Sequence, residues 1–245
     1  MSRHIAVLLA NTDTSAFARR YPDDAQKVVA MLQPLRPQWT TRIYAARDGE
    51  FPAADVPLDG VIITGSPASV NDPLPWIATA EAFVRDLARR GIPTVGLCFG
   101  HQLIARALGG RVVRATDWGL GIGHIDVAAT RPWMEPAAPH LNLYAAHQDQ
   151  VQQLPPGAQW LGGDAFCPNG LFVVGAAPGV ETLLGVQYHP ELPTDFMRAL
   201  LDHLEPHLPL GVVARARPQL DTPVDAALFF QWIARFIELP RKTLP

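Results

Sequence analysis

One cysteine in this chain stands where a nucleophile is often found. Cys98 lies in the segment GLCFG, at 96–100, between a short apolar run and a helical pattern. A nucleophile on such a strand-to-helix turn has a strained backbone, and glycines two residues away remove the clashes that side chains would cause. The following helix N-terminus favours a thiolate, and the N–H of Phe99 can bind an oxyanion. The pattern indicates a nucleophile, although free cysteines are most often small buried apolar residues.

His189 and Glu191 have the spacing of a base and its orienting group. A cysteine nucleophile needs a base, and the base needs a partner that fixes its tautomer. In the segment GVQYHPE, at 185–191, Pro190 fixes the loop after His189. Glu191 can then bind one ring nitrogen while the other nitrogen faces the sulfur. The alternative is a solvated loop histidine and a helix-terminal charge, but the presence of the cysteine turn favours a base and its orienting group.

The apolar pattern predicts the elements that position these residues. Strands alternating with helices favour an α/β fold whose mostly parallel central sheet has helices on both faces. After residue 111, short pieces joined by Pro/Gly loops predict a small antiparallel region. The predicted strands are 5–10, 40–44, 60–64, 93–97, 111–114, 122–127, 141–145, 171–176 and 183–187, and the predicted helices are 22–35, 75–90, 100–108, 193–204 and 224–239. Residues 206–223 read as a loop-like linker.

Composition restricts the partners and the location that we expect. The 245 residues fit a domain at 1–205, with a C-terminal loop and helix at 206–245 packed on it. The net charge of −3 gives no reason to expect nucleic acid, and no 18-residue apolar run predicts a membrane span. The two cysteines form neither a disulfide framework nor a zinc motif, so we expect a cytoplasmic protein without a metal.

The motifs GLCFGHQ and QYHPE resemble those of the class I, or triad, glutamine amidotransferases. The run IITGSP, at 62–67, falls where that family has a glycine-containing oxyanion loop. The resemblance covers roughly residues 58–192 and is strongest to stand-alone proteins similar to the glutaminase domain of GMP synthase. It implies a flavodoxin-like sheet and a triad of Cys98, His189 and Glu191. This triad would attack the γ-amide of glutamine through a γ-glutamyl thioester, without a cofactor.

The resemblance also implies contacts to the substrate. The oxyanion donors would be the amide of Phe99 and that of Gly65 or Ser66. Gln102, on the first helical turn after the cysteine, would hydrogen-bond the substrate.

A further stretch, AHQDQV at 146–151, resembles the family's S-H-G-D-x-V segment, whose backbone holds the amino-acid end of the substrate. His147 and Gln148 are therefore candidate binding residues. Ala146 stands where the family usually has serine, and Gln148 where it has glycine.

Three functions fit these residues. The first is a glutamine amidotransferase-like hydrolase, which we expect because the motif core resembles that family most closely. A separate synthetase subunit could then accept the ammonia, because the chain has no G-x-x-x-x-G-K-[ST] loop and no room for a synthetase domain. The second is a γ-glutamyl peptidase, which shares every catalytic residue and differs in the leaving-group pocket. The third is a non-catalytic binding or regulatory module, which the intact set of three residues disfavours.

Overall fold

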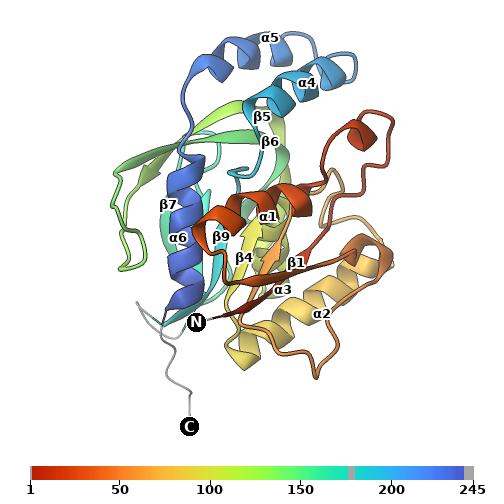
Figure 1. Cartoon of the computed structure of the whole chain (residues 1–245). Coiled ribbons are helices and arrows are strands. Elements are labelled where there is room, and N and C mark those ends of the chain that lie inside the picture. Colours follow the sequence, from red (N-terminus) through yellow and green to blue (C-terminus); the bar gives the residue numbers. More distant parts are fainter. Residues whose placement is uncertain (1, 176–179, 240–245) are drawn as a thin grey trace.

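A single nine-stranded sheet organises the molecule (Figure 1). The computed structural model describes residues 2–175 and 180–239. Residue 176 of the predicted 171–176 strand and residues 240–245 of the 206–245 region lie outside the described residues. The strand order is β2-β1-β3-β4-β9-β8-β7-β5-β6. The first five are parallel: β2 (Thr40–Tyr44), β1 (His4–Leu8), β3 (Gly60–Ile63), β4 (Thr94–Leu97) and β9 (Glu181–Val186). The predicted α/β class with a mostly parallel central sheet is confirmed.

Helices cover both faces of the parallel strands. Alternate residues of β1 point to opposite sides, as the period of a strand requires. Ile5 and Val7 pack with α1 (Asp24–Leu35) and α6 (Ala226–Glu238), whereas Ala6 and Leu8 pack with α2 (Pro75–Arg90) and α3 (Phe99–Ala107). No helix within the described ranges is long and apolar enough to cross a membrane.

The antiparallel part of the sheet is larger than the sequence predicts. It consists of β8 (Leu171–Gly175), β7 (Ala158–Gly163), β5 (Arg111–Val127) and β6 (His140–Gln153). The predicted pieces 111–114 and 122–127 are two ends of β5, which has 17 residues and shifts register between Arg114 and Gly119. The interruption broke the apolar pattern, and β7, whose Trp160 is exposed, was not predicted.

The predicted linker at 206–223 is wrong. It contains α5 (Val212–Ala216) and a 3₁₀ helix, η3 (Arg217–Asp221). Both pack with α4 (Thr194–Leu204) in a third apolar cluster, where Val212, Val213 and Leu220 are buried. Four prolines and one glycine are typical of a loop, but the apolar side chains between them pack in this buried cluster.

Candidate active site

Cys98 lies at the turn between β4 and α3, in the strained conformation that the sequence indicated. Its φ of 49° and ψ of −101° are unusual, and it is the one non-glycine residue with positive φ within the described ranges. A Cβ on Gly96 would come 2.3 Å from the carbonyl carbon of Gly100, and one on Gly100 would come 2.5 Å from the backbone oxygen of Ile63. Such close approaches leave room for glycine alone. The fold therefore holds a backbone strain of roughly 1–3 kcal/mol at the cysteine.

Adjacent strands bring His189 and Glu191 to the cysteine. Strands β4 and β9 are parallel, and their register pairs Thr94 with Leu183 and Leu97 with Val186. The N–H of Cys98 donates to the backbone oxygen of Val186 at 2.9 Å. His189 follows β9 by three residues, and its N–H donates to the backbone oxygen of Tyr144 at 2.7 Å. The imidazole and the Cys98 side chain both lie next to Gly65. The three side chains of Cys98, His189 and Glu191 are all buried.

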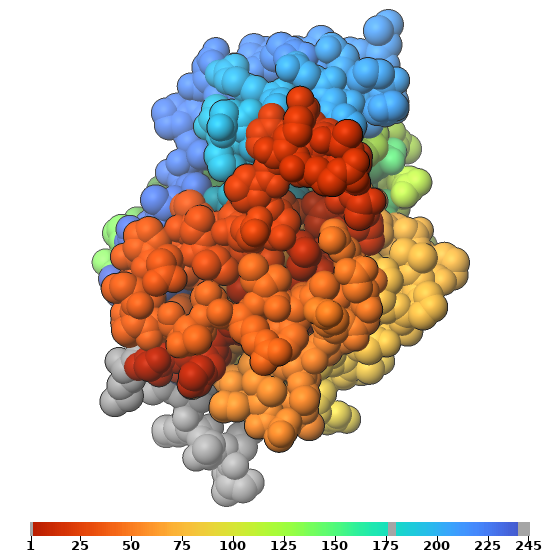
Figure 2. Space-filling model, turned by 45° about the vertical axis from the view of Figure 1, so that its right-hand side comes forward, coloured from red at the N-terminus to blue at the C-terminus, as the bar shows by residue number. Residues whose placement is uncertain are grey.

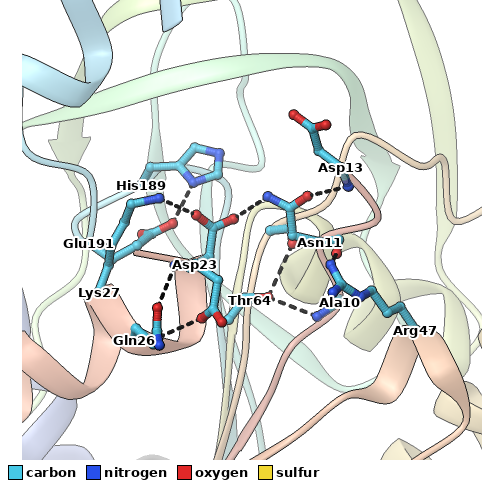
Figure 3. A network of polar contacts seen from close by, with 12 residues as sticks. Ala10, Asn11, Asp13, Asp23, Gln26, Lys27, Arg47, Thr64, His189 and Glu191 are labelled. Carbon is cyan, nitrogen blue, oxygen red and sulfur yellow. Dashed lines mark hydrogen bonds and ion pairs between the residues drawn. The ribbon is translucent and has the colours of Figure 1, made fainter. Parts of the chain in front are cut away.

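The His189 ring is bound to a carboxylate. Its Nδ1 lies 2.7 Å from Oε1 of Glu191 (Figure 3). Burial by itself lowers the pKa of His189, but the charges of Glu191 and Cys98 and the hydrogen bonds to both raise it well above its ordinary 6.5. The surroundings therefore favour the imidazolium form of His189, which can give a proton to a departing group.

Gly65 lies directly against this pair of residues. A Cβ at Gly65 would stand 2.7 Å from Cε1 of His189 and 3.6 Å from Cβ of Cys98. The loop that carries it is anchored by Thr64, whose hydroxyl accepts from the N–H of Ala10 at 3.0 Å and donates to the oxygen of Gly65 at 3.2 Å. A larger residue at position 65 has to displace the imidazole.

We expect Gly65→Ala to lower turnover about 10²-fold or more, because a displacement of about 1 Å at a reacting group has this effect. Gly60→Ala is a control at the start of β3, where the new Cβ would meet the buried Ile237 and Ile5 side chains at 3.0 and 3.2 Å, away from His189. Steady-state rates with melting curves would separate a site effect from unfolding. Equal rates for Gly65→Ala and wild type would contradict the close packing of this loop on His189.

A cavity of about 840 Å³ opens onto Cys98 and His189. Its lining contains four further residues singled out from the sequence, Ser66, Gln102, His147 and Gln148. The far wall comes from two segments that were not predicted to meet, the loop 11–23 after β1 and the helix α4. In Figure 2 the N-terminal segment, in red, lies against the blue C-terminal part of the chain.

Aromatic side chains join these two segments across the cavity. Phe17 stacks on His203 with ring centroids 4.4 Å apart, and Tyr21 meets Phe196 edge-on at 5.1 Å. Below them, Lys27 donates to Asp24 at 2.8 Å, and its ammonium lies 3.7 Å from the centre of the Phe196 ring. Sequence patterns give no sign of the aromatic contacts, because these join residues that are far apart in the chain.

The predicted substrate-binding residues are close to one another, but two of their side chains are already hydrogen-bonded to other groups of the protein. Gln102 donates through Nε2 to the backbone oxygen of Asp149 at 2.8 Å, and Nδ1 of His147 lies 3.1 Å from the same oxygen. Burial lowers the pKa of His147 to about 3, so its ring is neutral. Gln148 lines the cavity, and the ring of Phe99 is buried against Trp76. The role of each in substrate binding stays a prediction.

Comparison with known proteins identifies the family. The family model described as class-I glutamine amidotransferase matches residues 38–200. The chain belongs to this family. It is 32% identical over 133 residues to GMP synthase [glutamine-hydrolyzing] of Thermomicrobium roseum, a match that covers 54% of the chain and 23% of that protein. It is 28% identical to gamma-glutamyl peptidase 4 of Arabidopsis thaliana, over 81% of the chain and 79% of the peptidase.

Solved structures agree with this amidotransferase fold. A crystallised glutamine amidotransferase from Thermotoga maritima has a TM-score of 0.72 and 18% identity, and it covers 96% of this chain and 98% of its own. The resemblance inferred from GLCFGHQ and QYHPE is therefore confirmed at the level of family and fold.

Proposed function

We propose that the chain is a hydrolase that attacks the γ-amide of glutamine through a γ-glutamyl thioester. The proposal is supported by the placement of Cys98 and His189 beside Gly65 at the wall of the cavity, with Glu191 hydrogen-bonded to His189. This arrangement has the parts of nucleophilic acyl transfer: a nucleophile, a base and an orienting carboxylate.

The bond changes follow from these positions. The Cys98 thiolate adds to the carboxamide carbon, and backbone amides of Phe99 and of Gly65 or Ser66 hold the oxyanion. The His189 imidazolium gives its proton to the departing nitrogen as the C–N bond breaks, which releases ammonia. The neutral His189 then takes a proton from water, which adds to the thioester and releases glutamate and the thiolate. Glu191 keeps His189 in the required tautomer throughout.

A γ-glutamyl peptidase is the second candidate, and two observations favour it. A cavity of about 840 Å³ is near the upper end of the size of small-molecule sites, so a leaving group larger than ammonia has room. The similarity to gamma-glutamyl peptidase 4 also covers 81% of the chain, against 54% for the GMP synthase. The triad chemistry is the same, with an amino acid or peptide departing instead of ammonia.

A substrate panel decides between the two candidates. Purified protein without partners would be given glutamine, a γ-glutamyl tripeptide and a γ-glutamyl alkylamide, and ammonia, peptide and glutamate would be quantified. We expect measurable ammonia release from glutamine. Fast release of a dipeptide from the tripeptide, with negligible ammonia from glutamine, would establish the peptidase. If neither is turned over but a glutamine-analogue alkylating agent labels Cys98, a synthetase subunit that activates the site is indicated. Without labelling, the binding module is favoured.

A further inference from the structure

Gln187 lies beside the reactive sulfur, yet none of the steps above uses it. It follows β9 directly and is completely buried. Because Leu97 and Val186 are register partners, the next residues on the two strands, Cys98 and Gln187, emerge side by side. The Nε2 atom of Gln187 lies 3.5 Å from the Cys98 sulfur as a hydrogen-bond donor.

The surroundings fix which end of the Gln187 amide faces the sulfur. Gln102 has its Nε2 committed to the oxygen of Asp149, so this atom is an amide nitrogen, and it also lies 3.2 Å from Oε1 of Gln187. The Oε1 of Gln187 is therefore an acceptor. Nδ1 of His101 lies 3.1 Å from the same oxygen and its Nε2 lies 2.9 Å from the backbone oxygen of Asn169. A neutral ring donates to only one of these two oxygens, so it is Gln102 that fixes the orientation of the Gln187 amide. With the oxygen held on that side, the NH₂ group faces Cys98.

Apart from His189, the titratable groups His101, Cys167 and His147 are uncharged, so an uncharged hydrogen-bond donor beside the sulfur is compatible with them. His189, hydrogen-bonded to Glu191, is the cation whose charge interacts with the sulfur. Burial lowers the pKa of His101 to about 4, so this ring is neutral. Burial also raises the pKa of the Cys167 thiol, with smaller contributions from Asp164 and Cys98. His147 is neutral as well.

We propose that Gln187 is a catalytic residue that donates an amide hydrogen bond to the Cys98 thiolate. This inference rests on the proposed cysteine mechanism. The hydrogen bond is charge-assisted while the sulfur is a thiolate, and it weakens when the sulfur carries the acyl group. Gln187 therefore stabilises the sulfur at two stages, as the attacking thiolate and as the leaving group when water cleaves the thioester.

A structural role makes a different prediction. Through its oxygen, Gln187 also ties the end of β9 to His101 and Gln102 of α3. If it served for that alone, a substitution would lower the melting temperature and leave the chemistry of the sulfur unchanged. The two roles are separable by a measurement made on the sulfur itself.

The test is the pH dependence of Cys98 alkylation by iodoacetamide in wild type and in Gln187→Met, which keeps the length of the side chain and removes the donor. A hydrogen bond to a charged group contributes about tenfold or more, so we expect the midpoint of the alkylation profile to rise by about one pH unit. We expect kcat to fall about tenfold for the same reason. Gln159→Met, on β7, is the control. It loses a contact to Arg131 and should change neither the alkylation midpoint nor kcat.

Gln187→Glu serves as a second variant if Gln187→Met does not fold. A carboxylate beside the sulfur should move the alkylation midpoint further upward than removal of the donor. A midpoint and a kcat equal to those of wild type in a folded variant would overturn the proposal. Wild-type protein that forms no acyl-enzyme with any γ-glutamyl substrate, and whose Cys98 is no more reactive than Cys167, would overturn the cysteine mechanism itself, so the two failures are distinguishable.

Discussion

Cys98→Ala should remove the release of ammonia or peptide from every γ-glutamyl substrate, with a fall in kcat of about 10⁴-fold or more. The reason is that no other group replaces the sulfur in forming the thioester. The alanine keeps the Cβ, so the turn between β4 and α3 loses one buried atom and we expect a small change in stability. Steady-state product release and mass spectrometry of the trapped acyl-enzyme would check both expectations.

Cys167 is the matched control for this experiment. It is also completely buried, but no turn between glycines surrounds it, and burial raises the pKa of its thiol above the ordinary value. Cys167→Ala should therefore keep the activity. A glutamine-analogue alkylating agent should label Cys98 and spare Cys167. Peptide mapping that places the adduct on Cys167 alone would contradict the mechanism.

Glu191→Gln should lower kcat about 10³-fold while the fold is kept. The amide is nearly isosteric, but it carries no charge and can present an N–H to Nδ1 of His189, which selects the wrong tautomer. The carboxylate is also a main cause of the raised pKa of His189, so the variant should hold less imidazolium at neutral pH. The pH profile of kcat/KM and a melting curve would be measured together.

Glu238→Gln provides the comparison for a glutamate in an ion pair away from the cavity. Its carboxylate binds Arg36 at 2.6 Å near the surface. The pair is partly buried and bidentate, with contacts of 2.6 and 2.7 Å, so this variant should lower the melting temperature and leave turnover unchanged. A wild-type rate in Glu191→Gln would remove Glu191 from the mechanism.

Local patterns predicted the parts of the site that are made by neighbouring residues. The glycines at 96 and 100 mark a turn whose geometry leaves no room for side chains, and the H-P-E sequence places base and carboxylate two residues apart. The continuous apolar runs of β1, β3 and β4 indicate strands buried on both faces. These features are encoded within a few residues, so a single sequence is sufficient to find them.

Contacts across the chain were outside the reach of such patterns. The donor contact from Gln187 to Cys98 depends on the register of β4 and β9, which no local motif specifies. The stacking of Phe17 on His203 at the cavity wall joins two segments whose sequences contain no motif. The mistaken linker at 206–223 has the same origin, because its helices depend on the face against which they pack.

The parallel pairing of β4 with β9 determines how the site can come apart. Cys98 and His189, the proposed nucleophile and base, follow the ends of two neighbouring strands in the middle of the sheet, and the N–H of Cys98 belongs to the ladder between them. Interior strands exchange their amide hydrogens mainly through global unfolding, whereas surface loops open locally. A local opening of the loop 11–23, which lines the cavity, would therefore leave Cys98 and His189 side by side.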